Sequence, residues 1–283
     1  ARAEELAALR RGLPEGALLA VEGAALLPGE LGFTRAPGLA EIRAADPAQA
    51  EQLPRLAAVL RSDGGPVVHG ADLGARLEAA YLAAAERAVM AGATPAAVDA
   101  ALLGWGFAEP PFARLDRIGL GAAQARLTAA GLAAGPWLVW LGLEGRQGRA
   151  SGAGVYDYPA EGAPQPMAET AAVLQALRAE AGIAPQRLSP AEIVARVLAE
   201  LAGAGAAALQ AGAAHRAPDL DLVAGAALGF PRVHGGPMFQ ADRRGLLATR
   251  KRLRALVAEG APAPVTLWDV LIRNGRSFGE LTG

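Results

Sequence analysis

The sequence predicts a mostly α-helical protein in which one helical unit occurs twice, after a small α/β region at the N-terminus. Two observations favour the duplication. The pattern P-x4-D-x2-G-L occurs at 111–120 and again at 237–246, and each copy follows a Gly-Phe pair, at 106–107 and at 229–230. The third observation concerns strands: short apolar runs of the kind that form β-strands lie mainly in residues 1–70. A signature repeated at this distance indicates a duplicated unit.

The composition is that of a well-filled globular protein. Of the 283 residues, 52% are hydrophobic and 19% are charged, with a net charge of -1. This balance excludes a disordered chain and gives no basic surface for nucleic acid. The lack of cysteine excludes disulfides, thiolate catalysis and cysteine-ligated zinc. No apolar run approaches the ~20 residues of a membrane span, and the charged first residues are unlike a signal peptide, so we expect a cytoplasmic protein.

Residues 1–70 alternate short apolar runs with helical segments, which predicts a small sheet domain. Asp46 is the expected N-cap of the main helix in this region, and Pro54 interrupts the pattern of that helix. The predicted helices cover 3–11 and 48–60, and the predicted strands cover 17–21, 39–43 and 66–69.

From Asp72 the pattern becomes helical, and a proline-rich connector divides it into two units. Asp72 is a suitable N-cap for a helix that ends at Gly92, and Thr94 begins the next helix. The predicted domains are 1–70 (α/β), 71–160 (first helical unit), 161–188 (connector, with a helix at 168–181) and 189–283 (second helical unit, with helices at 192–211 and 267–273 and a turn at 217–218).

These residues resemble the L-3-hydroxyacyl-CoA dehydrogenase family, specifically the C-terminal part of the multifunctional fatty-acid oxidation enzymes. The resemblance is carried by Gly-Phe-Pro-Arg-x-x-Gly-Gly-Pro-Met-Phe-x-Ala-Asp at 229–242 and by Gly-Arg-x-Gly-x-x-x-Gly-x-Gly-x-Tyr at 145–156, where Ala150 replaces the family's lysine. It implies two helical domains that pair internally, attached to an NAD-binding Rossmann domain, and oxidation of 3-hydroxyacyl-CoA. Residues 10–70 resemble only the back half of that Rossmann domain.

The resemblance also implies which residues stand at the family's catalytic positions. In the family a histidine base, oriented by a glutamate, takes the hydroxyl proton with help from a serine and an asparagine. Here Gly32 stands at the histidine position, Ala24 at the serine position and Ala75 at the asparagine position. Glu41, the orienting carboxylate, is the catalytic remnant. Three small side chains in place of polar ones predict that this chain does not oxidise 3-hydroxyacyl-CoA by itself.

The sequence also lacks the glycine-rich loop that a dinucleotide needs. The string Gly-x-Gly at 203–205 lies inside a predicted helix and follows no strand, so it does not form a pyrophosphate site. We therefore expect no cofactor for this chain alone, although the family uses NAD. His69, His215 and His234 lack the spacing of metal ligands, so we expect no metal site.

Two features have both a structural and a functional interpretation. Asp116 and Asp242 occupy the same place in the two signatures, and we expect each to bind a cap or turn of its own unit, the alternative being a catalytic pair. The loop at 145–158 is either a brace whose glycines adopt positive φ or a contact for acyl-CoA. In the second case Arg146 and Arg149 are the residues suited to CoA phosphates.

Three functions follow from these expectations. The first is part of a 3-hydroxyacyl-CoA dehydrogenase whose cofactor loop lies upstream. The second is a non-catalytic relative, a pseudoenzyme, whose helical domains bind acyl-CoA or form a scaffold. The third is an assembly partner that pairs with another protein chain through the edge of the partial sheet.

Overall fold

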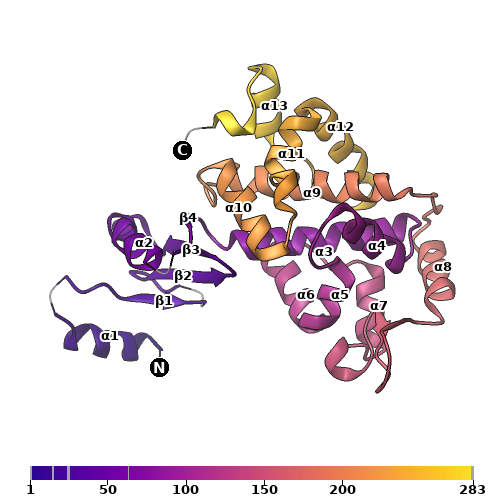
Figure 1. Cartoon of the computed structure of the whole chain (residues 1–283), viewed down its shortest axis with the longest axis horizontal. Helices are drawn as coiled ribbons and strands as arrows, with labels where there is room; N and C mark the ends of the chain where they lie inside the picture. Colours follow the sequence, from indigo (N-terminus) through magenta and orange to yellow (C-terminus); the bar gives the residue numbers. More distant parts are fainter. Residues whose placement is uncertain (1, 15, 24–25, 63, 282–283) are drawn as a thin grey trace.

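The computed structural model describes residues 2–14, 16–23, 26–62 and 64–281, and it shows a small sheet region beside a larger helical body (Figure 1). The sheet has the strand order β1-β2-β3-β4, in which β2 and β3 are antiparallel and the two outer pairs are parallel. The elements of this region are α1 (Arg2–Gly12), β1 (Ala20–Glu22), β2 (Leu31–Ala36), β3 (Leu39–Ala44), the 3-10 turn η1 (Pro47–Gln52), α2 (Leu53–Arg61) and β4 (Val67–His69).

The strand β2 is absent from the strands that the sequence predicts. Its segment contains Gly32, Thr34 and Arg35, so it shows no continuous apolar run. The strand forms because β3 supplies its hydrogen-bond partners across the short turn at 37–38. One end of β2, Leu31, is buried with α2 in a small core separate from that of the helical body.

The main helix of this region also differs from the prediction. It begins at Leu53 and not at residue 48, because Pro54 fits the first turn of an α-helix and the preceding residues form η1. Asp46 makes no side-chain cap to η1; its Oδ2 instead accepts a hydrogen bond of 2.8 Å from the backbone N–H of Gly29.

The helical body contains two runs of helices with the same order of lengths, a long helix first and shorter ones after it. The first run is α3 (Leu73–Ala91), α4 (Pro95–Trp105), α5 (Pro111–Ile118), α6 (Leu120–Ala129) and α7 (Pro136–Leu143). The segment after it holds η2 (Arg149–Ser151), β5 (Tyr156–Asp157), β6 (Gln165–Pro166) and α8 (Thr170–Glu180). The second run is α9 (Pro190–Gln210), α10 (Ala217–Leu228), η3 (Arg232–His234), α11 (Pro237–Arg244), α12 (Leu246–Leu256), η4 (Val257–Glu259), α13 (Thr266–Arg273) and η5 (Phe278–Glu280). Residues 217–218, predicted as a turn, are therefore the first residues of α10.

The long helices α3 and α9 lie side by side in the middle of the body and form its core (Figure 1). Helix α3 packs against α9 and α10, and α4 packs against α9. Trp137 of α7 and Trp268 of α13 are fully buried. The two runs therefore share one continuous hydrophobic core.

The two Gly-Phe pairs of the sequence contact each other across this core. Gly106 and Gly229 end α4 and α10 with positive φ values of 117° and 66°. The rings of Phe107 and Phe230 meet edge to face at 5.1 Å, and the N–H of Ala108 donates to the carbonyl of Gly229 at 2.9 Å. A Cβ on Gly229 would lie 2.6 Å from that of Ala108, so this close approach requires glycine.

Candidate functional site

A cleft of about 290 Å³ lies between the β2–β3 hairpin and the N-terminal turns of α3, and it includes positions that the sequence singles out. Glu41 and Ala75 both line it, together with Thr34, Arg35 and Arg126. A cleft where a sheet domain meets a helical domain is a common place for a small-molecule site.

The carboxylate of Glu41 caps the N-terminus of α3. Its Oε1 accepts a hydrogen bond of 2.7 Å from the N–H of Leu73, and its Oε2 accepts one of 3.3 Å from that of Gly74. Only 4% of Glu41 is exposed. Burial raises the pKa of Glu41, and the two backbone hydrogen bonds act in the opposite direction. In this structure Glu41 therefore binds α3 and orients no imidazole.

Asp72 does not cap α3 with its side chain, contrary to the prediction from its position. Its backbone adopts the left-handed conformation at φ 56°, and its side chain forms no cap hydrogen bond. Instead its Oδ1 accepts a hydrogen bond of 2.6 Å from Nη1 of Arg43 on β3. The cap at this helix therefore comes from a residue distant in sequence, which propensity rules do not detect.

Gly32, which the resemblance places at the family's histidine position, has a neighbouring side chain close to it. Gly32 lies on the same face of the hairpin as Glu41, because Thr34 is directly opposite Glu41 and alternate residues share a face. A Cβ on Gly32 would lie 2.6 Å from Cδ2 of Leu26. The side chain of Leu26 thus lies where a side chain at position 32 would begin. Ala24, which the resemblance places at the serine position, lies outside the described residues.

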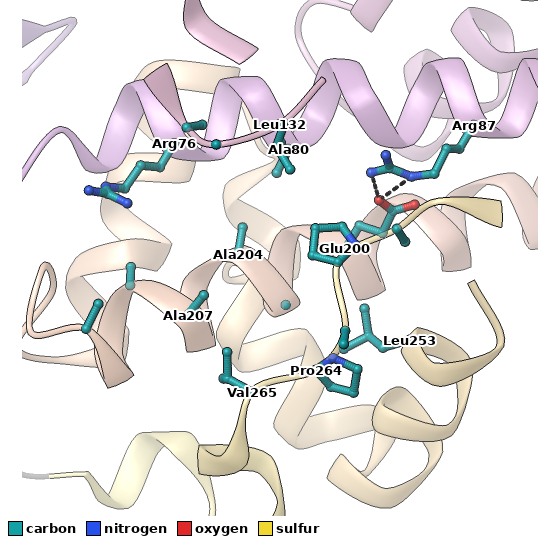
Figure 2. Close-up of a pocket in the computed structure, with 18 residues that line it drawn as sticks. Arg76, Ala80, Arg87, Leu132, Glu200, Ala204, Ala207, Leu253, Pro264 and Val265 are labelled. Atoms are coloured by element: carbon teal, nitrogen blue, oxygen red, sulfur yellow. Dashed lines mark hydrogen bonds and ion pairs between the residues drawn. The ribbon is translucent and has the colours of Figure 1, made fainter. Parts of the chain in front are cut away.

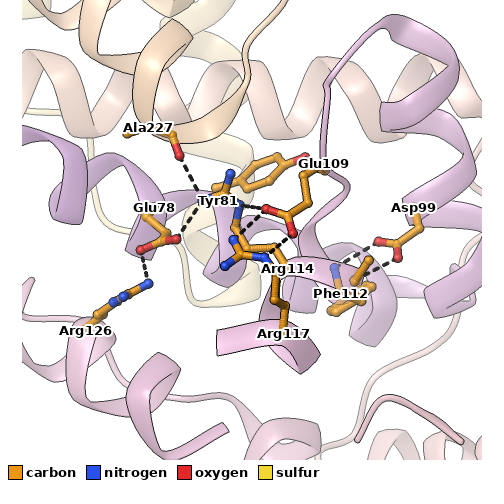
Figure 3. Close-up of polar contacts among 10 residues, drawn as sticks. Glu78, Tyr81, Asp99, Glu109, Phe112, Arg114, Arg117, Arg126 and Ala227 are labelled. Carbon is orange, nitrogen blue, oxygen red and sulfur yellow. Dashed lines mark hydrogen bonds and ion pairs between the residues drawn. The ribbon is translucent and has the colours of Figure 1, made fainter. Parts of the chain in front are cut away.

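A cluster of charged side chains adjoins this cleft on α3, α5 and α6 (Figure 3). Glu78 accepts a hydrogen bond of 2.8 Å from Nη1 of Arg114 and forms an ion pair with Arg126. The same nitrogen of Arg114 also donates to the carbonyl of Ala227 on α10 at 2.8 Å, so the cluster ties the two helical runs together. The side chain of Arg126 is 38% exposed, which leaves part of its guanidinium at the cleft surface.

The loop at 145–158 is folded against the first helical run. Arg146 donates from Nε to the carbonyl of Gly154 at 2.7 Å and from Nη2 to Asp157 at 2.5 Å. The guanidinium carbon of Arg149 lies 5.8 Å from the centre of the Tyr158 ring, and Arg149 is exposed. Three glycines of the loop have positive φ, as the brace interpretation expects. A contact with CoA phosphates at these arginines stays a prediction.

Two of the histidines lie together although they are far apart in sequence. The rings of His69, at the end of β4, and His215, before α10, have centroids 4.3 Å apart. Burial lowers the pKa of His69, the positive charge of His215 lowers it further, and Asp219 acts in the opposite direction. Among the described residues, no group of three or more His, Asp or Glu side chains can hold a metal ion. His234 stacks on Trp105 at 4.2 Å.

The described residues do not fit NAD. The glycines at 203 and 205 lie inside α9, where a Cβ on Gly205 would meet the sulfur of Met238 at 2.4 Å. They are therefore packing positions between helices. No described strand leads through a glycine-rich turn into a helix N-terminus, the arrangement that binds a pyrophosphate.

The fold, a helical body with a small sheet region before it, is shared with solved dehydrogenase structures. The chain is similar to 3-hydroxybutyryl-CoA dehydrogenase from Escherichia coli, with a TM-score of 0.76 at 19% identity over 96% of this chain and 79% of the other. It is also similar to the dehydrogenase part of multifunctional enzyme 1 from C. elegans, with a TM-score of 0.64 at 17% identity over 94% of this chain and 67% of the other.

The sequence comparisons agree with the structural ones. Residues 73–158 match the family model described as 3-hydroxyacyl-CoA dehydrogenase, C-terminal domain. The chain is 29% identical over 245 residues to a protein from Danio rerio named peroxisomal bifunctional enzyme. These matches support the relationship to the 3-hydroxyacyl-CoA dehydrogenase family that the sequence motifs predict, with residues 73–158 matching its C-terminal domain.

The extent of these matches differs between the relatives. The match covers 72% of this chain and only 34% of the Danio rerio protein, so the chain spans about a third of that relative. Among the described residues, no helix is both long and apolar enough to cross a membrane.

Proposed function

We propose that this chain is a non-oxidising member of its family that binds an acyl-CoA ester in the cleft between the β2–β3 hairpin and α3. The observation that carries the proposal is the hydrogen bonding of Glu41, whose carboxylate accepts from the backbone N–H groups of Leu73 and Gly74. A carboxylate that caps a helix supports the fold whether or not a catalytic base is present.

Among the described residues, the cleft lining holds no histidine that could take the hydroxyl proton of a 3-hydroxyacyl ester. Its carboxylates already have partners: Glu41 binds the start of α3, Asp72 binds Arg43, and Glu78 binds Arg114 and Arg126. Leu26 lies where a side chain on Gly32 would project. These contacts support a cleft that binds without oxidising.

The cleft retains groups that suit binding. Arg35 and Arg126 line it, and guanidinium groups bind phosphates and carboxylates through paired N–H donors. The loop at 145–158 contributes no residue to the cleft lining; as a separate contact for CoA phosphates, Arg149 is the better candidate, because two nitrogens of Arg146 already bind Gly154 and Asp157. Within the cleft, Arg35 and Arg126 are the groups proposed to bind the ligand.

The experiment mixes the purified protein with NADH and acetoacetyl-CoA and follows the NADH absorbance, with an active family dehydrogenase as the positive control. We expect no oxidation of NADH above the rate without protein. Measurable turnover that scales with protein concentration would contradict the proposal.

Calorimetric titration with acetoacetyl-CoA tests binding separately. We expect Arg35→Gln to weaken binding about tenfold, since it removes a charge-assisted contact. Arg61→Gln, an exposed position on α2 outside the cleft, is the matched control and should leave the affinity unchanged. If the wild type releases or takes up no heat and shows no binding by a second method, the acyl-CoA part of the proposal fails.

The proposal includes the duplication. Asp99 of α4 accepts from the N–H groups at the start of α5, and Asp221 of α10 does the same at the start of α11. Asp116 and Asp242, one in each signature, bind backbone N–H groups near the end of their own runs. Such matched contacts support two copies of one domain that pair internally, and neither aspartate of the signatures lies in the cleft.

A second candidate function is assembly with another protein through the sheet. The strand β1 lies at one end of the strand order and pairs with β2 on one side only. An open strand edge can accept a strand of a partner. Pull-down with a proline substituted at Val21 as the negative control tests this function. The cytoplasmic location is likewise a proposal, which fractionation of cells that express the protein tests.

A further inference from the structure

A separate cavity of about 330 Å³ lies on the opposite face of α3 from the cleft, between the two helical runs (Figure 2). Arg76, Ala80 and Arg87 of α3 line the cavity, whereas Gly74, Ala75 and Glu78 line the cleft. At 3.6 residues per turn these two sets project from opposite sides of the helix. A ligand in the cavity therefore does not compete with a ligand in the cleft.

The walls of the cavity are apolar and firm. Ala204 and Ala207 of α9 form one side, and both are only half-buried because the cavity exposes them. The segment 261–265, which connects η4 to α13, forms another side. Pro262 and Pro264 fix the φ angles of this segment, so the wall is preorganised. Leu132, between α6 and α7, lies above the cavity.

The charges at the two ends of the cavity differ. At one end Arg87 donates from Nε to Glu200 at 2.9 Å, and the pair is neutral. Glu200 is 5% exposed, and its second oxygen, Oε1, has no hydrogen-bond partner among the described residues. At the other end Arg76 uses Nε to bind the carbonyl of Ala71 at 3.0 Å and forms no ion pair with any described residue.

We propose that this cavity binds a linear aliphatic carboxylate, with its head group at Arg76 and its chain along Ala204 and Ala207. The Nη groups of Arg76 supply paired donors for a carboxylate. At the far end the unpaired oxygen of Glu200 is an acceptor, so it offers a carboxylate no donor, and this difference fixes the direction of the ligand. Arg76 and Arg87 are separated by about 16 Å along α3, a span that suits an extended aliphatic chain.

The charge pattern also selects against other amphiphiles of the same shape. An alkyl ammonium ion would place its charge beside the uncompensated guanidinium of Arg76. In the reverse orientation it could donate to Oε1 of Glu200, but it would have to bury its charge beside a carboxylate that Arg87 already neutralises, and the loss of hydration outweighs that contact. An uncharged alcohol would fill the same apolar space without a charged partner for Arg76. The order of affinity is therefore carboxylate, alcohol, amine.

The experiment is calorimetric titration of the protein with decanoate below the concentration at which it forms micelles, with decanol and decylamine as matched ligands. We expect Arg76→Gln to weaken decanoate binding about tenfold. Ala207→Leu, which places a larger apolar side chain at the half-buried cavity wall, should weaken it by a similar factor or abolish it. Arg232→Gln, at an exposed position of η3, is the control and should bind like the wild type.

Three results would overturn the inference: no binding of decanoate to the wild type, equal affinity for decylamine, or wild-type affinity in both Arg76→Gln and Ala207→Leu. Thermal unfolding of each variant shows whether it is folded, and Arg76→Gln, on an exposed side chain, keeps the test valid if Ala207→Leu is unstable. Titration of Ala207→Leu with acetoacetyl-CoA separates this cavity from the cleft, because the acyl-CoA site should be unaffected.

Discussion

The two helical units hold matching aspartates in different surroundings. In both units the carboxylates accept hydrogen bonds from backbone N–H groups. Asp99 and Asp221 bind the start of the helix that carries the signature, and Asp116 and Asp242 bind the backbone near the end of the unit. In the first unit, tyrosine hydroxyls add to these contacts. Tyr156 donates to Asp99 at 2.9 Å and Tyr158 donates to Asp116 at 3.0 Å, whereas Asp242 binds only the N–H groups of residues 278 and 279 among the described residues.

This difference shows which contacts a helical unit of this kind needs. The backbone hydrogen bonds to the aspartates occur in both units, so in the second unit they hold its last turn against the helix that carries the signature. The tyrosines come from the loop at 145–158, which the first unit has in addition. Asp116 is 1% exposed beneath this loop, and Asp242 is half-buried. The first unit is therefore closed by a buried polar network and the second by a simpler surface turn.

The largest effect should come from removal of the two signature aspartates. Asp116→Ala leaves the N–H groups of Val155 and Tyr156 and the hydroxyl of Tyr158 without an acceptor, which should cost about 4 kcal/mol. Asp242→Ala leaves only the N–H groups of Phe278 and Gly279, of which the second is exposed, and should cost about 2 kcal/mol. Urea denaturation of the two variants measures both values. Equal losses would show that the loop at 145–158 adds nothing to the first unit.

The glycines beside these aspartates provide a closer comparison. A Cβ on Gly154 would lie 2.0 Å from Oδ1 of Asp116, whereas a Cβ on Gly279 would lie 3.5 Å from Oδ2 of Asp242, an ordinary contact. Gly154→Ala should therefore destabilise the protein by about 3 kcal/mol, because the backbone of the loop must move away from Asp116. Gly279→Ala should change stability by less than about 0.5 kcal/mol. Thermal unfolding of both variants measures this difference in stability. A similar shift in the melting temperature of the two variants would contradict the prediction.

The order of the helices could be predicted from the sequence because local signals mark it. Glycines end α3, α4 and α10, and Thr94 caps α4 by accepting from the N–H of Ala97. The equivalence of Asp116 and Asp242 also followed from the repeated signature, and their hydrogen bonds to turns of their own units confirm the structural interpretation. These features depend on residues close in sequence or on an exact repeat.

The features that the sequence did not reveal depend on partners distant in sequence. Glu41 caps α3 from another element, 32 residues before Leu73, so propensity rules assigned the cap to Asp72 instead. His69 and His215 meet because the residues after β4 and after α9 run beside each other, where Gly70 and Ala214 form a bridge. No local pattern encodes such a contact.

The smallest effect should be a pH dependence that the two units share. Burial raises the pKa of Asp99 and of Asp221 to about 6, from 3.8, against the backbone hydrogen bonds that each accepts. A carboxyl group whose pKa is raised on folding contributes stability that is fully present below pH 3.8 and is lost as the pH rises through about 6. The cost of Asp99→Asn and of Asp221→Asn should therefore be greater at low pH, and it should decrease by about 2 kcal/mol between pH ~4.5 and ~7.

Urea denaturation of the wild type and the two variants at both pH values measures this decrease. It should be similar in the two units, because burial is the largest cause in both and raises each pKa to about 6. At Asp99 the hydroxyl of Tyr156 lowers the pKa and the charge of Asp116 raises it. At Asp221 the charge of Asp242 raises the pKa in the same way. A cost that does not change with pH in either variant would show that these carboxyl groups remain ionised in the folded protein. A decrease for Asp221→Asn alone would show that Tyr156 keeps Asp99 ionised and that the network of the first unit changes its chemistry as well as its stability.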